Sequence, residues 1–497
     1  MTRSGISGAV AAGHEKTAEA AAAILREGGN AFDAAIAGLW MACVVEPVLA
    51  SPGGGGFFMT FEADRGQVNL IDFFVETPCR KRSINDVEFK SVHADFGTAT
   101  QEFHVGAGAS ATPGFVPGLF AVHEALGSIP MHRLAEQACE VARHGVKISD
   151  FQAMLLKIVE PIYLWSDGAK ALFAPNGSMV KSGETYRNPD LAGAIEAIAR
   201  EGARIATEGE IASAMLDSVG DGCLTSQDLK TYPVAVRQPY QIELQDHILY
   251  LNPPPSSGGS LIGHMLKLSR SGRSVGQSDL EIAKTISNTD KRWRDAGCDV
   301  QPFLTRTAEG HGGHASRGTT HISILDRHGN AAAVTVSNGE GNGHVVPQCG
   351  FMVNNMLGEE DLNQGGFYTW RESSRLSSMM APTIARGRQG SLTALGSGGS
   401  NRIRSAVFQV LDHLMNDRLS VEDAVIAPRM HVEHNHLDFE DFFAPGVAPT
   451  LMKAFPSHRA WPVRNMFFGG AHVVRQSKSG SLEAFGDPRR AGVSVTL

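Results

Sequence analysis

The sequence predicts a protein of the α+β class, built as one large layered fold or as two or more domains. Three observations lead to this expectation. The chain has 497 residues, about three times the length of a typical domain. Its first part is rich in alanine, which favours helices, while later segments alternate in polarity as strands do. With 42% hydrophobic and 19% charged residues, the chain has enough apolar surface to fold.

The helices of the first half are predicted from composition and end signals. Residues 15–27 are rich in Ala, Ile and Leu, and two glycines follow as a C-terminal stop. Residues 31–45 are almost wholly apolar but too short to cross a membrane, which predicts a helix buried in a core. The stretch from about residue 110 to 220 is mostly helical in pattern, and apolar spacing of three and four is clearest in 131–144.

Strands are expected on both sides of this helical stretch. Four successive glycines, residues 53–56, precede an apolar strand at 57–61 and a second strand at 68–74. Residues 232–251 alternate like strands, and the Pro-Pro-Pro-Ser-Ser-Gly-Gly run at 253–259 separates them from another helix.

The region around residues 300–318 is polar, rich in Gly and His, and has almost no apolar periodicity. We interpret it as an exposed loop and as the internal boundary of the chain. A hairpin follows, with strands at 320–325 and 331–337 joined by a turn. A helix is expected from about residue 403 to 415, and short strands with turns after it.

Charge and composition exclude several classes of partner. The net charge is −8, and Lys/Arg and Asp/Glu are scattered, so nucleic acid is not expected as the main partner. No apolar stretch reaches 18 residues, so no membrane span is expected. The first 25 residues carry charges and lack the apolar core of a signal peptide. The six cysteines form no CxxC motif and are expected to be free thiols, so the sequence predicts a cytoplasmic protein.

The sequence gives little support for three common kinds of functional site. The glycine clusters do not give a Walker loop or a GxGxxG motif, which argues against nucleotide binding. No GxSxG elbow for a serine hydrolase occurs, although GSGGSN at 396–401 comes near it. Histidines could ligate zinc, but no metal-binding frame such as HExxH exists, and neither metal nor cofactor is expected; these histidines are His311, His314, His431, His434 and His436.

Thr319 begins the predicted hairpin directly after the exposed loop, which suits one chemistry. If the Gly318–Thr319 bond is cut, Thr319 gains a free α-amino group beside its own hydroxyl, with a pKa near 7.7–8.0. That amine can take the hydroxyl proton and activate the threonine as a nucleophile. A hairpin threonine can equally be an ordinary β-forming residue, and both interpretations are open at this point.

Several runs of the chain together resemble the gamma-glutamyltranspeptidase family of N-terminal-nucleophile hydrolases. They occur in family order and extend over nearly the whole chain, which makes coincidence implausible. The matching runs are 28–35 (GGNAFDAA), 44–47 (VVEP), 53–57 (GGGGF), 254–259 (PPSSGG), 319–323 (TTHIS), 354–355 (NN), 376–379 (LSSM), 396–400 (GSGGS) and 487–490 (DPRR).

The resemblance implies a four-layer αββα sandwich that is made as an inactive precursor. Self-cleavage before Thr319 would give a large subunit of residues 1–318 and a small catalytic subunit of residues 319–497, interleaved in one fold. The threonine of such proteins attacks a γ-glutamyl amide, forms an acyl-enzyme and passes the acyl group to water or an amine. The implied partners are therefore a small-molecule amide and the protein's own processed subunits.

The resemblance also implies roles for individual residues. Gly398 and Gly399 match the pair whose backbone amides form the oxyanion hole, and Ser337 matches a hydroxyl that bonds the nucleophile. Four residues fall at or beside substrate-binding positions. Ser377 and Ser378 match the serines that hold the substrate α-carboxylate, Glu359 matches the acid that pairs with the α-ammonium, and Asn338 lies in the segment after the second hairpin strand.

The chain departs from the family pattern at the carboxylate clamp. Val75 occupies the place of the family arginine, and Arg80, Lys81 or Arg82 are the nearby cations that could reach the site instead. Met356 replaces the usual glutamine, and Asn338-Gly339 replaces the usual Leu-Asn. Acyl-transfer chemistry is expected, while recognition of a glutamate head group is open.

Three functions follow as alternatives. The first is a γ-glutamyl hydrolase or transferase that accepts glutathione or another γ-glutamyl amide. The second is a related acylase for a non-glutamyl acyl group, for example in glutaryl amides, and the absent arginine favours it. The third is an uncleaved, non-catalytic binding relative. Whether residues 361–375 fold over the site as a lid is a further open question.

Overall fold

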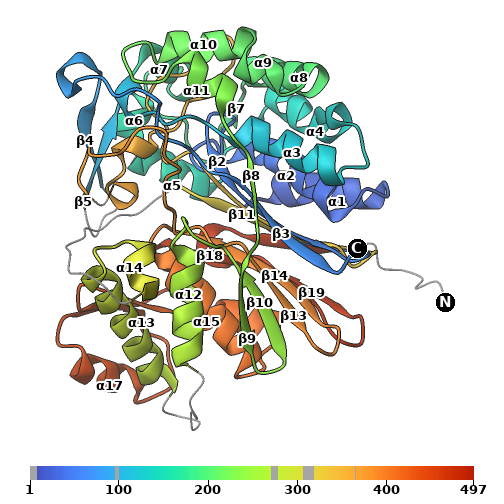
Figure 1. The fold of residues 1–497 in the computed structure, drawn as a ribbon, viewed down its shortest axis with the longest axis vertical. Helices are drawn as coiled ribbons and strands as arrows, with labels where there is room; N and C mark the ends of the chain where they lie inside the picture. The colour runs from blue at the N-terminus through green and yellow to red at the C-terminus, as the bar shows by residue number, and fades with distance from the viewer. Residues whose placement is uncertain (1–7, 96–99, 270–277, 306–317, 364) are drawn as a thin grey trace.

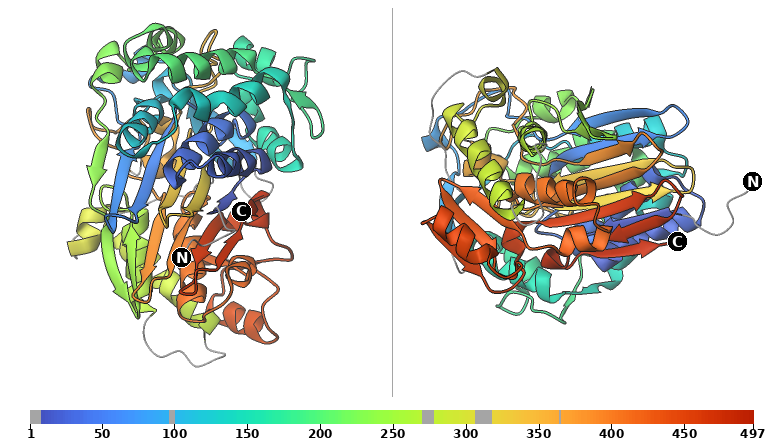
Figure 2. Two further views of the ribbon diagram at one scale, coloured as in Figure 1. Left: turned by 90° about the vertical axis from the view of Figure 1, so that its right-hand side faces the viewer. Right: turned by 90° about the horizontal axis from the view of Figure 1, so that it is seen from below.

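The computed structural model describes residues 8–95, 100–269, 278–305, 318–363 and 365–497. Two β-sheets lie face to face at its centre, and helices cover the outer face of each sheet (Figure 1). The views from the side and from below show the same stacking (Figure 2). The layers run helix, sheet, sheet, helix, which confirms the expected four-layer α+β sandwich.

The first sheet has seven strands, and neighbouring strands are antiparallel. This sheet combines strands that precede Gly318 in the chain with strands that follow it. In spatial order they are β20 (Val493–Thr496), β1 (Gly8–Ala12), β11 (Thr320–Asp326), β12 (Ala331–Ser337), β2 (Gly55–Glu62), β3 (Gln67–Phe73) and β8 (Ala235–Arg237).

The second sheet has six strands and is also antiparallel. It too combines strands from both sides of Gly318. In spatial order they are β19 (Leu482–Phe485), β18 (Gly470–Gln476), β14 (Leu392–Gly398), β13 (Thr383–Gly387), β10 (His247–Leu251) and β9 (Tyr240–Leu244). Smaller ladders are formed by β4 (Lys90–Asp95) with β5 (Thr100–Val105), β6 (Val146–Lys147) with β7 (Thr185–Tyr186), and β15 (Met430–Glu433), β16 (His436–Glu440) and β17 (His458–Trp461).

Helices of the first half cover the first sheet, and helices of the second half cover the second sheet (Figure 1). In the first group are α1 (Glu15–Arg26), α2 (Ala31–Val45), α3 (Phe115–Leu126), α4 (Met131–His144), α5 (Asp150–Ile158), α6 (Glu160–Tyr163), α7 (Asp167–Phe173), α8 (Pro189–Glu201), α9 (Arg204–Thr207), α10 (Glu210–Ser218) and α11 (Ser226–Thr231). In the second are α12 (Gly258–Leu268), α13 (Ser278–Asp295), α14 (Val300–Thr305), α15 (Arg402–Met415), α16 (Val421–Ile426) and α17 (Val447–Ala454).

Helix α2 confirms the prediction of a buried apolar helix. All of its residues are buried, because it lies between the first sheet and the outer helices α1 and α4. Its start is fixed by a capping box, in which the Asn30 side chain accepts from the backbone at Asp33 and the Asp33 side chain accepts from the backbone at Asn30. The helix ends at Val45, so Glu46 lies directly beneath the sheet.

The central hairpin β11–β12 sends alternate side chains to opposite layers. Ile322 and Ile324 of β11, with Val334 and Val336 of β12, pack into the core shared with the helices. The intervening residues point toward the second sheet, where buried polar side chains meet. His321 contacts Thr335 Oγ1 and Ser323 Oγ, each at 2.8 Å. The inter-sheet space next to the hairpin is therefore polar.

One sequence expectation is wrong in part. Residues 300–318 were expected to form an exposed loop, but residues 300–305 form helix α14. Val300 and Phe303 are buried there against Trp293 and Leu261, because a spacing of three places both on one helix face. Residues 306–317, with His311 and His314, lie outside the described residues.

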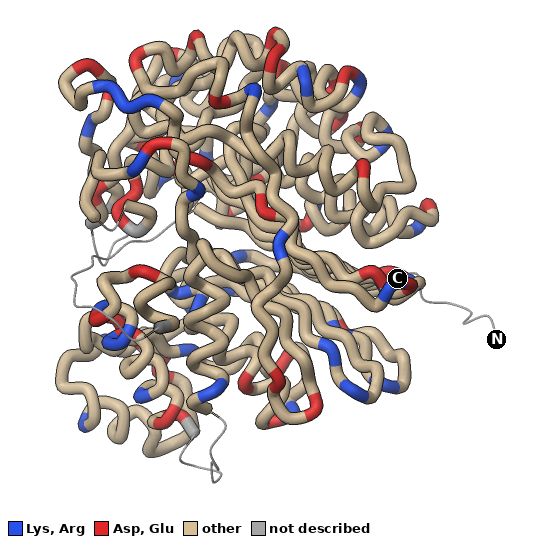
Figure 3. The backbone as a smooth tube through the Cα atoms, viewed as in Figure 1, with Lys and Arg blue, Asp and Glu red and all other residues tan. Residues whose placement is uncertain are grey.

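Three further observations bear on the sequence analysis. No helix in the described segments is long and apolar enough to cross a membrane. All six cysteines are free thiols, as expected. Lysine and arginine are interspersed with aspartate and glutamate along the visible backbone (Figure 3).

Candidate active site

The hairpin brings Thr319 and Ser337 together on the side that faces the second sheet. Thr320 pairs with Val336 in the β11–β12 register, so the next position outward places Thr319 opposite Ser337. Because side chains alternate along a strand, Thr319 faces the second sheet while Thr320 faces the helices. Both Thr319 and Ser337 are buried, and both line one pocket.

Both backbone polar groups of Gly318, the residue before Thr319, form hydrogen bonds. The Ser337 hydroxyl donates to the Gly318 carbonyl oxygen at 2.6 Å. The Gly318 amide donates to Glu340 Oε1 at 3.1 Å, and the Gly339 amide donates to Ser337 Oγ at 3.0 Å. These contacts fix the position of the Gly318 carbonyl beside Thr319.

Gly398 and Gly399 lie beside Thr319 at the end of β14. A Cβ atom on Gly398 would come within 2.2 Å of the Thr319 carbonyl oxygen, so no side chain fits there. Gly399 has φ +123°, a conformation that favours glycine. Its own Cβ would meet the Gly469 Cα at 2.9 Å. The absence of a side chain at Gly398 therefore allows close approach of the backbone to Thr319, and Gly399 allows close approach to Gly469.

The pocket at Thr319 is lined by both polar and apolar side chains. It has a volume of about 450 Å³, open solvent included, and Glu359 is the one charged side chain among its described lining residues. The carboxyl group of Glu359 lies within 2.3 Å of the point that a Gly339 Cβ would occupy. The lining residues are Phe74, Ser257, Thr319, Ser337, Met356, Glu359, Leu362, Ser377, Ser378, Met379, Met380, Ser400 and Ile403.

The segment that carries Ser377 and Ser378 is fixed by the start of helix α12. The Ser378 carbonyl accepts from the Ser256 hydroxyl at 2.6 Å and from the Ser257 amide at 2.9 Å. Gly258 lets the two segments approach, since a Cβ on it would lie 2.1 Å from the Met379 carbonyl oxygen. This explains why a Ser-Ser-Gly-Gly run opens that helix.

A buried carboxyl group lies on the helix side of the hairpin. Glu46 is fully buried after helix α2 and accepts hydrogen bonds from the hydroxyls of Thr17 and Thr320, each at 2.8 Å. Burial raises the pKa of Glu46 to about 7, although both hydroxyl donors act in the opposite direction. Glu46 thus contacts the residue next to the candidate nucleophile without entering the pocket.

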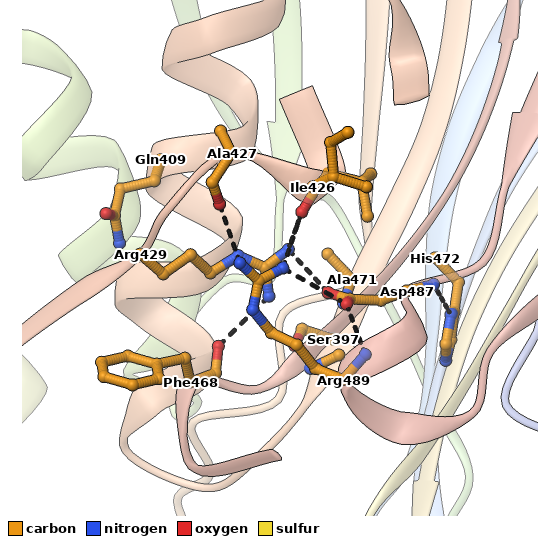
Figure 4. A network of polar contacts seen from close by, with 12 residues as sticks. Ser397, Gln409, Ile426, Ala427, Arg429, Phe468, Ala471, His472, Asp487 and Arg489 are labelled. Carbon is orange, nitrogen blue, oxygen red and sulfur yellow. Dashed lines mark hydrogen bonds and ion pairs between the residues drawn. The ribbon is translucent and has the colours of Figure 1, made fainter. Parts of the chain in front are cut away.

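Behind the glycine strand lies a network of buried ion pairs (Figure 4). Asp487 pairs with Arg429 at 2.7 Å and accepts from the Ala471 amide at 2.9 Å. Arg489 bridges Asp487 and Glu440. The two arginines hold the pKa of Asp487 below its usual value, despite burial. The network joins the C-terminal turn to strand β18, which pairs with the glycine strand.

A sequence model of the family described as gamma-glutamyltranspeptidase matches residues 17–293 and 277–497. The chain belongs to this family. Among its relatives, the capsule biosynthesis protein CapD proenzyme of Bacillus anthracis is 28% identical over 97% of this chain and 89% of its own length. The glutathione hydrolase proenzyme of Pseudomonas aeruginosa is 28% identical (99% and 94%), and the acylase ACY 1 proenzyme of Pseudomonas sp. strain SE83 is 26% identical (99% and 94%).

Solved structures agree with this family assignment. Cephalosporin acylase from Bacillus halodurans has the same fold, with a TM-score of 0.83 at 20% identity, covering 99% of this chain and 96% of that one. Gamma-glutamyltranspeptidase from Helicobacter pylori matches with a TM-score of 0.51 at 26% identity, covering 59% and 84%. The expectation of a hydrolytic, acyl-transferring enzyme is confirmed at the level of the family.

None of Arg80, Lys81 and Arg82 takes the place of the family arginine in the pocket. Val75 is fully buried and does not line the pocket. Lys81 donates to the carbonyls of Tyr368 and Trp370, and Arg82 donates to those of Gly220 and Gly222, so these cations are bound elsewhere. The exposed Arg80 does not line the pocket either. Lys81 thus contacts Tyr368 and Trp370, and Leu362 lines the pocket.

Arg375 lies beside the segment that carries Val75, but it too is engaged. Its guanidinium contacts the Phe74 carbonyl and the Tyr232 hydroxyl, and it pairs with Asp72 at 3.4 Å and Glu76 at 3.3 Å. It lines a neighbouring hollow that shares Ser377 with the pocket. Two carboxylates already compensate this arginine, so it does not supply a free positive charge to the pocket.

The structure brings together most of the predicted site residues and separates one. Thr319, Ser337, Glu359, Ser377 and Ser378 line the same pocket. Asn338 does not line it; its side-chain amide points instead to the Met352 carbonyl, at 3.4 Å. Since Asn338 follows Ser337 at the end of a strand, alternation turns it away from the side of Thr319 and Ser337, and its substrate-binding role stays a prediction.

Two lining residues were missed, although the quoted runs contain them. Ser257 and Ser400 both reach the pocket, from the 254–259 and 396–400 runs respectively. Each of these serines is next to a glycine at which two backbone segments come close together. A serine next to such a glycine is the signal that could have identified them.

Among the described residues, the predicted histidine cluster does not form a metal centre. His431 contacts Ser405 Oγ at 2.8 Å, and His436 contacts Ser457 Oγ at 2.8 Å. The described residues whose ligand atoms lie within 4.8 Å of one another are instead Asp412, His413 and Asp417, on the surface end of α15. They lie outside the pocket.

Proposed function

We propose that this protein is an autoprocessed threonine amidohydrolase and acyltransferase that cleaves γ-glutamyl amides through an acyl ester on Thr319. One observation carries the proposal. Thr319, Ser337, Glu359 and the serine pair Ser377 and Ser378 meet in one pocket although they lie on separate segments of the chain. The glutathione hydrolase relatives support glutathione or another γ-glutamyl compound as the donor.

In the first reaction the chain cuts itself. The Thr319 hydroxyl loses its proton and its oxygen adds to the Gly318 carbonyl carbon, while the Ser337 hydroxyl hydrogen-bonds the oxygen of that carbonyl at 2.6 Å. The Gly318–Thr319 C–N bond then breaks, and the released α-amine takes up the proton. Water hydrolyses the resulting ester, which leaves subunits 1–318 and 319–497 with Thr319 as a new N-terminus.

In the second reaction the new N-terminus acts on the substrate. The α-amine takes the proton of the Thr319 hydroxyl, whose oxygen attacks the substrate carbonyl. The Gly398 and Gly399 amides are suited to hold the negative oxygen, since Gly398 lets the end of β14 come close to Thr319 with no side chain between them. The amine product leaves with the proton, and water or an acceptor amine then releases the acyl group from Thr319.

The charge of the residues that line the pocket favours a second candidate for the acyl group. Glu359 fits an ammonium group, but no Lys or Arg is among the described lining residues to bind a carboxylate. An acyl group that carries an ammonium or no charge suits this pocket better than one with a carboxylate. The same argument disfavours glutaryl amides, whose terminal carboxylate would meet Glu359.

Four p-nitroanilides separate these candidates. The γ-glutamyl compound has both head-group charges, the 4-aminobutyryl compound only the ammonium, the glutaryl compound only the carboxylate, and the butyryl compound neither. Release of p-nitroaniline from the γ-glutamyl compound above a Thr319→Ala control supports the first candidate. A clear preference for the 4-aminobutyryl compound supports the second.

The uncleaved, non-catalytic alternative is tested on a denaturing gel. Processed protein gives two bands and an N-terminal Thr319 peptide, and Thr319→Ala stays as one chain. Wild-type protein that remains uncleaved and releases no p-nitroaniline from any of the four compounds would contradict the proposed function.

A further inference from the structure

Arg490 lies against the glycine pair, close to Thr319. It ends the turn Pro488–Arg490 and is 3% exposed. Its Nη1 atom lies 3.2 Å from the point that a Cβ on Gly398 would occupy, and its Nη2 atom 3.4 Å from the corresponding point on Gly399. The Thr319 carbonyl oxygen lies 2.2 Å from that same Gly398 point. The guanidinium is therefore close to both the glycine pair and the nucleophile residue.

Glycines on two adjacent strands leave space for the Arg490 side chain. Its aliphatic carbons lie across Gly470, where any Cβ would approach them to within 2.7–2.9 Å. Gly470 pairs with Gly398 in the β14–β18 ladder, so the side chain crosses two adjacent strands at positions without side chains. A larger residue at Gly398, Gly399 or Gly470 would displace it.

Arg490 differs from its neighbours in having no polar partner. In the described part of the chain, none of its three guanidinium nitrogens has a hydrogen bond. The adjacent Arg489 pairs with Asp487 and Glu440, and Arg429 pairs with Asp487 (Figure 4). Burial, with the charge of Arg402, lowers the pKa of Arg490 to about 10, so the group stays charged at neutral pH. A buried charge without a partner destabilises a fold.

We propose that Arg490 is a positioning residue for the acyl-transfer reaction, which holds the Gly398–Gly399 backbone and strengthens its positive potential. The inference rests on the proposed function. When Thr319 adds to the substrate carbonyl, negative charge develops on an oxygen beside these glycines. A fixed cation beside the pair favours that charge in the transition state and has little effect on the neutral substrate. The unpaired state of Arg490 is what leaves its charge available.

The expected effect is on turnover rather than binding. A unit charge several ångströms from the developing oxyanion, in surroundings with an effective dielectric constant of about 20, corresponds to about tenfold to hundredfold in rate. Arg490→Met keeps the length and removes the charge, so kcat is expected to fall by this factor while KM changes less than about threefold. Arg490→Lys keeps the charge and is expected to retain most of the activity.

Stability provides the readout that separates this role from a structural one. Removal of an unpaired buried charge is expected to raise the thermal midpoint of Arg490→Met, while kcat falls. The matched control Arg489→Met breaks buried ion pairs with Asp487 and Glu440 and is expected to lower the midpoint. Self-cleavage of Arg490→Met is expected to stay near the wild-type rate, because Ser337, not the glycine pair, contacts the Gly318 carbonyl.

The experiment measures kcat and KM on the best of the four p-nitroanilides, thermal midpoints, and the self-cleavage rate, for wild type and the three variants. A wild-type kcat in Arg490→Met would overturn the inference. So would a lower midpoint together with equal losses of activity in Arg490→Met and Arg490→Lys. Wild-type protein inactive on all four compounds would contradict the proposed function and this inference with it, and that result is seen without any variant.

Discussion

Glu46 gives the fold a dependence on pH that one substitution should remove. The group is fully buried, with hydroxyl partners on Thr17 and Thr320, and burial raises its pKa from 4.5 to about 7. Between these two values the folded protein binds a proton at this site that the unfolded chain has released. The folded state is therefore favoured below about pH 4.5, and this stabilisation is lost as the pH rises through 7.

The size of the effect follows from the shift. About 2.5 pKa units correspond to about 3 kcal/mol of unfolding free energy. Glu46→Gln has nearly the same shape as the protonated acid and does not ionise. At pH 4.5 we expect the variant and its parent to be about equally stable, and by pH 8 we expect the variant to be more stable by about 3 kcal/mol.

The measurement is denaturant unfolding from pH 4.5 to 8 in a Thr319→Ala background, which keeps the chain uncleaved. Buried histidines such as His321 and His472, whose pKa values are lowered by burial, contribute equally to both proteins and cancel in the difference. Glu201→Gln, at an exposed position on α8, is the control and should follow the parent curve. Parallel curves for Glu46→Gln and its parent would refute the reasoning, because they would show that Glu46 ionises alike in both states.

Three further predictions concern the pocket. Ser337→Ala removes the donor to the Gly318 carbonyl and should slow self-cleavage about 100-fold on a denaturing-gel time course, while Ser337→Thr should cleave at nearly the wild-type rate; equal rates for Ser337→Ala and wild type would contradict the donor role. Glu359→Gln should raise KM about tenfold for the 4-aminobutyryl anilide but not for the butyryl anilide, and equal changes for both would exclude an ammonium contact. Gly399→Ala should lower the thermal midpoint, since φ +123° and the nearby Gly469 oppose a Cβ, and an unchanged midpoint would contradict this strain.

Local pattern was sufficient for most elements of the fold. The predicted helices at 31–45 and 131–144 have the same bounds in the structure, because apolar composition and flanking Pro or Gly fix both ends. The hairpin at 320–337 was also predicted, since strict alternation and a Gly-Asn turn leave few alternatives. Helix α14 was missed, because it rests on two apolar contacts, Val300 and Phe303, with distant parts of the chain.

In the pocket, only the residues that lie in family motifs could be predicted from the sequence. Motif positions singled out Thr319, the serine pair and Glu359, and these residues do meet in one pocket. The pairing of Arg375 with Asp72 and Glu76 was not predictable, because it joins segments about 300 positions apart. The same holds for the unpaired state of Arg490: a DPRR run shows two adjacent arginines, and only the fold shows that one is paired and the other is not.

The contacts around Thr319 assign the two carbonyl oxygens of the proposed reactions to different parts of the fold. In the intact chain the Gly318 carbonyl is bound by the Ser337 hydroxyl on β12, a strand of the first sheet. The glycine pair, with Arg490 behind it, belongs to the second sheet and faces Thr319 itself. A loss of the Ser337 hydroxyl should therefore act first on self-cleavage, whereas a loss of the Arg490 charge should act only on turnover. If both variants slowed both reactions equally, one shared oxyanion site would have to replace the two that the structure indicates.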